Sequence, residues 1–429
     1  MNKGQAVTGG VLLLLILFIG KSTLSSSMLF FRLLAGMGFG YALTRGFMGF
    51  AGSVNRAYNT GSTKLMRVLA YMFLGTSVLT TAFLYNSDAS SYGLWVNPIN
   101  SGLIIGGLLF GFGMTFSVCC ASGVLTDVVT GFSRGFITLI FFGMGVFLGF
   151  PFQRAADWVV AAGIPTDWIR KTAFSTETFP DGVYFPDLFK GDGLDGYLGA
   201  ILLTAFLAGI VIYLSKRYEQ NRKVNGTFTG VPSEIEQCKV LADCDNGVSE
   251  FKLLSEETYV RLFVKPWSMG IGAAVIAVIF TLLMGVTKNG WGASTPYGWW
   301  FGRFLMIFGV SPESLASFSN VPVKFYTMPF FDHPINVQNI GIMVGTVICL
   351  LLAGTFKSTV TTEIKITPKQ GFLYAMGGIF MGLGTRLANG CNVGALYTPI
   401  ANFSLSGWIF FAALVGGGII GNIVAKKIK

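Results

Sequence analysis

Charged side chains are scarce in this 429-residue chain, where Asp, Glu, Lys and Arg together make up only 12% of the residues. A typical soluble domain is about 25% charged, so a soluble protein of ordinary type is excluded. Hydrophobic residues make up 52% of the chain, and the mean hydropathy is +0.63. Apolar segments recur from end to end, which also excludes a protein with a single membrane anchor. The composition therefore predicts an all-α polytopic membrane protein.

Histidine and cysteine are also rare. The single histidine, His333, excludes His-based metal sites and histidine catalysis, and six cysteines are too few for a disulfide scaffold. A GxxxxGK(S/T) nucleotide-binding motif is missing, which argues against ATP-driven transport by this chain alone. The net charge of +10 comes without a basic stripe interleaved with aromatics, so we expect no nucleic-acid partner. We also expect no metal and no cofactor.

Apolar segments of membrane-spanning length are frequent. A helix that crosses a bilayer needs about 20 mostly apolar residues, and we predict about nine or ten such helices. The candidate segments are 6–20, 28–43, 66–85, 101–117, 134–152, 195–214, 269–287, 338–354, 371–388 and 406–425. The apolar piece 297–310 does not fit as another full span, so we predict a re-entrant or interfacial helix there.

The charges between these segments predict an orientation in the bilayer. Residues 44–67 carry four basic side chains and no acid, and the last residues of the chain include three lysines. Cytoplasmic loops carry an excess of Lys and Arg, so both regions are predicted to be cytoplasmic. We expect a multi-pass protein of the bacterial cytoplasmic (inner) membrane with its C-terminus inside. Its predicted parts are a membrane repeat over 1–215 with an outer loop at 153–194, a cytoplasmic insertion at 216–266, and a second membrane repeat over 267–429.

An internal repeat is the most informative feature. Residues 106–123 read GGLLFGFGMTFSVCCASG, and residues 377–394 read GGIFMGLGTRLANGCNVG. At a constant offset of 271 residues, Cys120 matches Cys391. The predicted topology inverts one copy relative to the other. Inverted repeats with interrupted helices and a binding site near the midplane are a transporter architecture. A re-entrant half-helix after each Cys would turn its N-terminal N–H groups toward the pore, and such helix ends favour anions.

The repeated cysteines indicate the substrate chemistry. A thiol is a weak donor and a soft, polarizable group, so two thiols could pass a sulfur-containing anion between them. The alternative is that each Cys is simply a small buried hydrophobe, which is how we interpret Cys349. Cys119 is a third candidate, although adjacent helical residues face different directions. The remaining candidate binding residues near the two motifs are Gly113, Gly123, Gly384, Gly394, Arg386, Asn389 and Asn392.

Two charged residues near these motifs have competing interpretations. Arg386 could attract a divalent anion, because an intramembrane Arg is expensive and usually functional or paired. It could equally be a structural side chain that snorkels to the interface. Asp127 follows Cys120 by seven residues and could couple protons or pair with Arg134. We predict the pairing, because buried charges are normally paired.

At these motifs the sequence resembles the YeeE/YedE family, which is associated with uptake of thiosulfate and related sulfur compounds. The resemblance rests on GLGTRLANGCNVGALY (382–397), GFGMTFSVCCASG (111–123) and FGYALTRGFMGFAGSVNRAYNTG (39–61). It implies a permease rather than an enzyme, and a small cytosolic sulfur-carrier partner of the TusA type. The family usually has another Cys just before Phe50, where this chain has Gly49 with Met48 beside it. The Met48 thioether could partly replace that thiol.

Other functions stay open at this point. The missing family Cys is also compatible with a different substrate, either another sulfur oxyanion or a selenium compound. A third alternative is a membrane sulfurtransferase in which Cys120 or Cys391 accepts persulfide sulfur. That chemistry needs a thiolate activated by a cation or a helix N-terminus.

Overall fold

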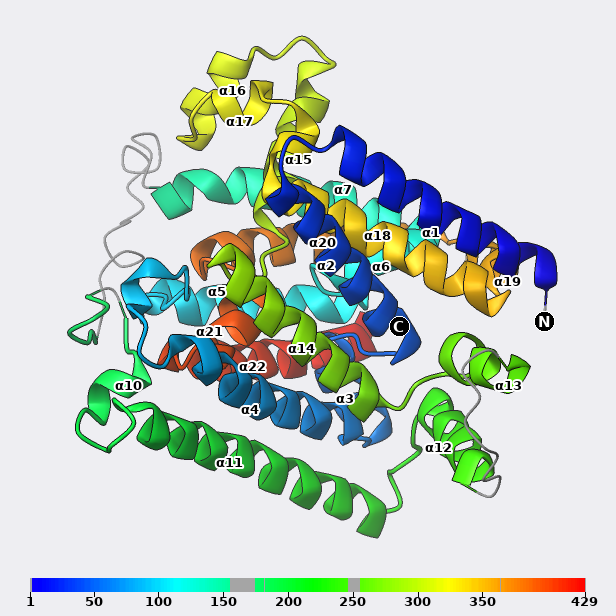
Figure 1. The fold of residues 1–429 in the computed structure, drawn as a ribbon, viewed down its shortest axis with the longest axis horizontal. Coiled ribbons are helices and arrows are strands. Elements are labelled where there is room, and N and C mark those ends of the chain that lie inside the picture. Colours follow the sequence, from blue (N-terminus) through cyan, green and yellow to red (C-terminus); the bar gives the residue numbers. More distant parts are fainter. Residues whose placement is uncertain (1, 155–173, 181, 246–254, 363, 429) are drawn as a thin grey trace.

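The computed structural model describes residues 2–154, 174–180, 182–245, 255–362 and 364–428. Within these ranges every regular element is a helix, and β-pairing is limited to two isolated bridges, Gly93 with Asn289 and Tyr184 with Ser404. The predicted all-α membrane fold is therefore confirmed (Figure 1). Much of the predicted outer loop, at 155–173 and 181, lies outside the described residues, as does 246–254 of the predicted insertion.

All ten predicted spans are helices. Eight are long and apolar enough to cross a membrane: α1 (Lys3–Thr23), α2 (Ser27–Arg45), α4 (Lys64–Leu84), α7 (Phe132–Arg154), α11 (Tyr197–Val224), α14 (Met269–Thr287), α18 (Pro334–Ala353) and α22 (Leu405–Ile428). The other two are α5 (Ser101–Ser117), which is shorter, and α20 (Pro368–Leu387). The start of α20 is encoded locally, because Thr367 and Gln370 form a capping box around Pro368.

Short helices connect or interrupt these spans. Three lie next to the sequence motifs: α3 (Gly52–Thr60), α6 (Gly123–Thr130), and the π-helical turn η4 (Asn392–Tyr397) that continues into α21 (Thr398–Ala401). The apolar piece predicted at 297–310 forms α15 (Thr295–Met306). The rest are η1 (Ala89–Ser91), α10 (Phe185–Leu188), α12 (Pro232–Asp245), α13 (Glu256–Tyr259), η2 (Val260–Val264), α16 (Pro312–Ser319), α17 (Lys324–Thr327), η3 (Phe330–Asp332) and α19 (Phe356–Thr362).

The helices pack as two related sets. When residue numbers are shifted by 271, α5 aligns in sequence with α20, α6 aligns with η4 and α21, and α7 aligns with α22. Helix α5 packs against α20 and α22, while α20 packs against α5 and α7. In the same way α2 packs along α18 and α4 along α14, and α1 and α11 cover α18 and α4 from outside. The contact of α5 with α22 thus corresponds to that of α20 with α7, and the contact of α2 with α18 corresponds to that of α14 with α4. In the same way the contact of α1 with α18 corresponds to that of α11 with α4, as a pseudo-two-fold axis requires.

Glycines at the crossing of α5 and α20 show that the two sets are inverted. A Cβ atom on Gly106 would lie 2.7 Å from the carbonyl oxygen of Gly384, and one on Gly377 would lie 2.8 Å from that of Gly113. The earlier residue of each helix therefore meets the later residue of the other, so the helices are antiparallel. Small residues permit this close backbone approach. The predicted inverted repeat is confirmed.

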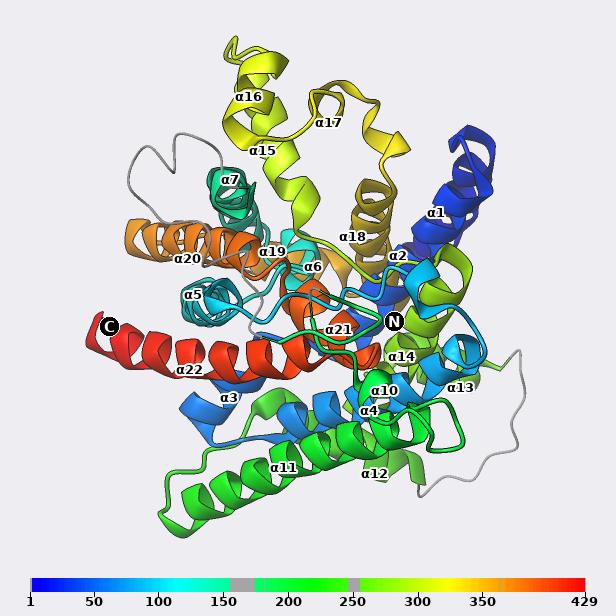
Figure 2. The same ribbon diagram turned by 90° about the vertical axis from the view of Figure 1, so that its left-hand side faces the viewer.

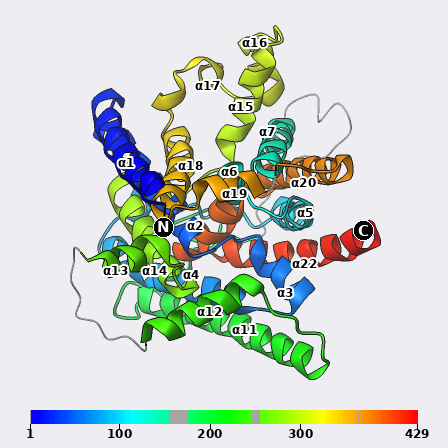
Figure 3. The ribbon, with the colours of Figure 1, turned by 90° about the vertical axis from the view of Figure 1, so that its right-hand side faces the viewer.

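The segments predicted to be cytoplasmic gather at one end of the molecule, which we call the α12 face. Both chain termini lie at this end, together with α3, α12 and α19 (Figures 1 and 3). The Nζ of Lys369 donates to the carbonyl of Ile428 at 2.6 Å, and Arg56 pairs with Glu234 of α12 at 3.1 Å. Figure 2 views the molecule from the opposite end, where α10 lies, while α15 to α17 project from the helical body.

Candidate functional site

Each repeated cysteine lies where a long helix breaks and a short one begins. Helix α5 ends at Ser117 and α20 ends at Leu387. Val118 and Asn389, which follow these ends at equivalent positions, adopt left-handed conformations with φ of 59° and 57°. Two residues later the backbone turns back into helix. The carbonyl of Cys120 accepts from the N–H of Val124 at 2.7 Å, and that of Cys391 accepts from the N–H of Ala395 at 2.6 Å. Both cysteines therefore stand at the start of a half-helix, as predicted.

Cys120 is buried among backbone donors. Its side chain is 1% exposed. The Sγ atom accepts from the N–H of Gly123 at 3.4 Å and lies 3.6 Å from the hydroxyl of Ser122. Ala51, just before α3, lines the same cavity as Cys120. The third sequence motif, residues 39–61, thus folds against the first cysteine.

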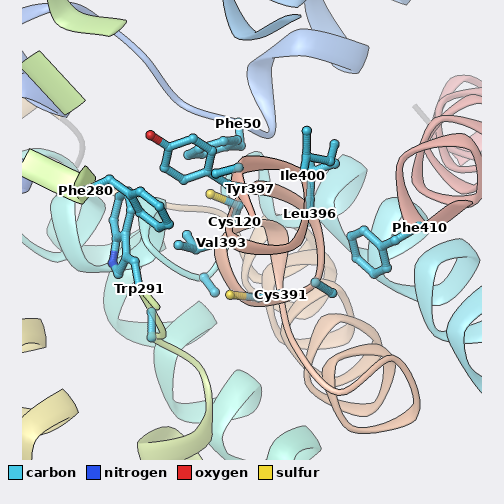
Figure 4. Close-up of a cluster of buried hydrophobic side chains, with 14 of the residues drawn as sticks. Phe50, Cys120, Phe280, Trp291, Cys391, Val393, Leu396, Tyr397, Ile400 and Phe410 are labelled. Carbon is cyan, nitrogen blue, oxygen red and sulfur yellow. The ribbon is translucent and has the colours of Figure 1, made fainter. Parts of the chain in front are cut away.

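Cys391 lies deeper, in the apolar core (Figure 4). Its neighbour Asn392 is fully buried, and the amide of Asn392 donates to the sulfur of Met114 at 3.2 Å. The other end of that amide has no hydrogen-bond partner among the described residues. A buried polar atom left unpaired is costly, and because this atom is the amide oxygen, an acceptor, only a donor such as a hydroxyl, a thiol or a water could satisfy it.

A cavity of about 770 Å³ runs from Cys120 to the α12 face. Its wall contains four sulfur-bearing side chains, which are Met48, Cys119, Cys120 and Cys349. At the other end it is bordered by residues of α12 that include Glu236 and Gln237. Cys391 does not line this cavity. In this conformation only the first of the two repeated cysteines borders the open space.

Buried aromatic side chains gather near the two cysteines (Figure 4). Tyr397 is surrounded by other rings, with centroid distances of 4.7 Å to Phe280, 6.1 Å to Phe50 and 6.1 Å to Trp291 (Figure 4). Trp291 in turn stacks on Phe39 at 3.8 Å. This aromatic cluster is buried. The cavity is therefore open toward the α12 face, while Cys391 and the aromatic cluster lie in the buried core.

Tyr297 is a site residue that the sequence motifs do not reveal. It comes from α15, is 1% exposed, and donates its hydroxyl to the carbonyl of Ala121 at 2.6 Å. That bond ties α15 to the short link between Cys120 and α6. Only the apolar character of 297–310 is visible in the sequence.

Several predicted site residues lie away from the cavity. Arg386 is buried and donates to the hydroxyls of Ser294 at 3.1 Å and Thr295 at 3.2 Å, and its guanidinium lies over the ring of Phe150. Asn389 is exposed and accepts from the amide of Gln153 at 2.5 Å. The two residues thus share one end of α20, beyond Cys391.

The four predicted glycines are divided between the cavity and helix contacts. Gly113 and Gly384 lie in the α5–α20 crossing, and the backbone of Gly394 faces the ring of Trp95. Gly123 lines the cavity beside Met48 and Cys119.

Ionisable groups in the cavity wall are mostly paired. Asp127 and Arg134 form the predicted ion pair at 3.3 Å, which is confirmed. In the described part of the chain, no group of three His, Cys, Asp or Glu side chains could hold a metal ion. The chemistry at the end of the cavity is therefore that of thiols, a thioether and backbone N–H groups.

Comparisons with known proteins agree with this chemistry. The family described as sulphur transport matches residues 45–420. The chain belongs to this sulphur-transport family. It is 22% identical to the thiosulfate transporter TsuA of Spirochaeta thermophila over 390 residues, which cover 89% of this chain and 94% of TsuA.

Two further relatives match over a shorter region. The chain is 28% identical to the probable transporter YedE of Escherichia coli over 158 residues and 27% identical to that of Salmonella typhimurium over 159 residues. Each match covers 37% of this chain and 38% of the relative. The chain thus aligns with little more than a third of the length of these two YedE proteins.

Proposed function

We propose that this member of the sulphur-transport family imports thiosulfate, or a closely related sulfur-containing anion, through a path that passes Cys391 and then Cys120. The observation that carries the proposal is the placement of two buried thiols at equivalent points of an inverted repeat, one bordering an open cavity and the other beyond it. The similarity to TsuA, a thiosulfate transporter that aligns with most of the chain, supports this substrate class.

The residues at the cysteines suit weak, reversible binding. A thiol can donate a weak hydrogen bond to the terminal sulfur of thiosulfate, and both groups are soft and polarizable. The N–H groups at the start of α6 and η4 favour negative charge. No covalent step is needed, and conduction requires binding weak enough for release. The aromatic cluster around Tyr397 would separate the two ends of the path.

The orientation follows from charge. The α12 face collects the basic segments, so we assign it to the cytoplasm by the positive-inside rule. The C-terminus is then cytoplasmic, in a bacterial inner membrane. The open cavity faces the cytosol in this assignment, and substrate arriving from outside would reach Cys391 before Cys120. A TusA-type carrier would receive its sulfur on this face.

A sulfurtransferase is the second candidate function, and the N–H of Gly123 favours it because this contact would stabilise a Cys120 thiolate. In that reaction the thiolate attacks the terminal sulfur of thiosulfate, sulfite leaves, and Cys120 keeps a persulfide. A permease carries both sulfur atoms of thiosulfate across the membrane, whereas the sulfurtransferase would carry only the terminal sulfur.

Dual labelling separates them. The protein is reconstituted alone into liposomes and supplied with thiosulfate labelled at either sulfur. We expect both labels to enter the liposomes at equal rates. Competition between thiosulfate and its selenium analogue tests whether the protein also accepts a selenium compound. Entry of the terminal sulfur alone would replace the permease with the sulfurtransferase. Adding a TusA-type carrier inside the liposomes is expected to raise net uptake, and an unchanged rate would contradict the partner.

Gly49 provides a smaller prediction. It lines the cavity, and a Cβ atom built there meets no atom within 4 Å. Gly49→Cys should therefore fold normally and add a thiol to the path. One extra soft contact is worth about 1 kcal/mol, so we expect uptake or thiosulfate selectivity to change several-fold at most. Competition between thiosulfate and sulfate measures it. Gly49→Ser is the matched control, and equal behaviour of the two variants would contradict a role for sulfur here.

A further inference from the structure

Arg45 is a buried cation in the cavity wall. It is the last residue of α2 and is 8% exposed. One terminal nitrogen of its guanidinium donates to the backbone carbonyl of Phe263, which lies in η2. Its Nε is buried and has no hydrogen-bond partner. Among the described residues no carboxylate forms an ion pair with Arg45.

The other two arginines that line the cavity are different. Arg56 pairs with Glu234 at 3.1 Å, and Arg134 pairs with Asp127 at 3.3 Å. Burying an ion without a counter-ion is expensive, and an ionisable residue at membrane depth is most often functional. The C-terminal end of α2 offsets part of this cost, because its carbonyls are partly negative. An anion in the cavity would supply the rest.

Cys349 adds a soft group to the same wall. It lies on α18, is fully buried and lines the cavity. The hydroxyls of Thr44 and Thr346 are 3.2 Å apart, which places the end of α2 against α18 one turn before Cys349. Arg45, the residue after Thr44, lines the same cavity as Cys349. A cation and a thiol from opposite halves of the chain therefore share one stretch of the cavity wall.

We propose that Arg45 and Cys349 form a second anion-binding site, nearer to the α12 face than the repeated cysteines and selective for oxyanions that carry a terminal sulfur, such as thiosulfate. We call this pair the Arg45 site. The planar guanidinium can hold two oxygens of a sulfonate group, while the thiol contacts the terminal sulfur. Sulfate would engage Arg45 but offers no terminal sulfur to Cys349. The inference rests on the proposed function and assigns selectivity within it.

The charge of the Arg45 site can be tested without any transport. The full-length protein in nanodiscs is treated with an anionic sulfonatoethyl or a cationic trimethylammonium-ethyl methanethiosulfonate, and labelling of Cys349 is followed by peptide mass spectrometry. We expect the anionic reagent to react faster. Arg45→Gln should lower the anionic-to-cationic rate ratio by roughly tenfold, since one charge in a partly desolvated site changes the ratio by about that much. Arg45→Lys should retain most of it.

Cys238 is the internal control in the same digest. It is exposed and lies 3.2 Å from Lys64, outside the cavity lining, so its rate ratio should not respond to Arg45→Gln. A Cys349 thiol that reacts with neither reagent, or a ratio unaffected by Arg45→Gln, would overturn the Arg45 site.

Selectivity is tested by inhibition of uptake. Arg45→Gln should weaken the binding of both anions, so that the KM for thiosulfate and the inhibition constant for sulfate each rise by about tenfold. Cys349→Ala should weaken thiosulfate several-fold and leave the inhibition constant for sulfate unchanged, and equal effects on the two anions would remove Cys349 from the site. If the wild type takes up no thiosulfate while the labelling ratio behaves as expected, the proposed function fails and the anion site stands.

Discussion

Alanine at position 120 or at position 391 is expected to lower thiosulfate uptake by at least about tenfold at equal membrane expression. Each substitution removes one thiol from the proposed path. A contact worth about 1–2 kcal/mol changes a rate by roughly tenfold. Cys120 borders the cavity and Cys391 lies in the closed core, so the two losses affect successive steps. Initial uptake rates in cells or liposomes measure both.

The matched control is Cys238→Ala, because Cys238 is exposed and outside the cavity lining. It should transport at the wild-type rate. Serine at 120 or 391 keeps a donor but loses the soft sulfur, so serine variants that match alanine would assign the effect to sulfur rather than to hydrogen bonding. Wild-type uptake rates in both alanine variants would contradict the proposal that these thiols act in transport.

The helices and the paired motifs could be predicted because both are determined by short stretches of sequence. Long apolar runs identify the spans, and the offset of 271 residues relates Cys120 to Cys391 without any structure. The inversion then followed from counting spans. The ion pair of Asp127 with Arg134 was also accessible, since the two residues are close in sequence and buried charges are normally paired.

The cavity could not be predicted, because its wall is assembled from segments far apart in the chain. Cys349 looked like a small buried hydrophobe when only its own span was considered, yet α18 brings it beside the end of α2. Tyr297 reaches the cysteines through a helix that carries no motif. The repeated glycines were recognised, but their equivalence alone does not distinguish ligand contact from helix packing. The structure places Gly113 and Gly384 in packing contacts.

Gly384→Ala is expected to destabilise the protein strongly. A Cβ atom at this position would lie 2.6 Å from the carbonyl oxygen of Gly106 and 2.8 Å from the backbone nitrogen of Phe110. Backbone atoms of a packed helix cannot move aside as the end of a flexible side chain can, so α5 and α20 would have to separate. Overpacking of this kind typically costs about 1–3 kcal/mol. We expect reduced yield and a lower temperature for loss of the monodisperse protein in detergent.

Gly209→Ala is the matched control for the α5–α20 crossing. Gly209 lies within the span α11, where a Cβ atom would meet nothing within 4 Å. Replacing a helical Gly by Ala without a clash favours the helix by about 1 kcal/mol, so this variant should be as stable as the wild type or slightly more stable. The reciprocal variant Gly113→Ala should behave like Gly384→Ala, because a Cβ atom there would lie 2.6 Å from the carbonyl oxygen of Gly377. Stability equal to that of Gly209→Ala in both crossing variants would mean that α5 and α20 do not meet backbone to backbone, and the pseudo-two-fold contact at the centre of the fold would be wrong.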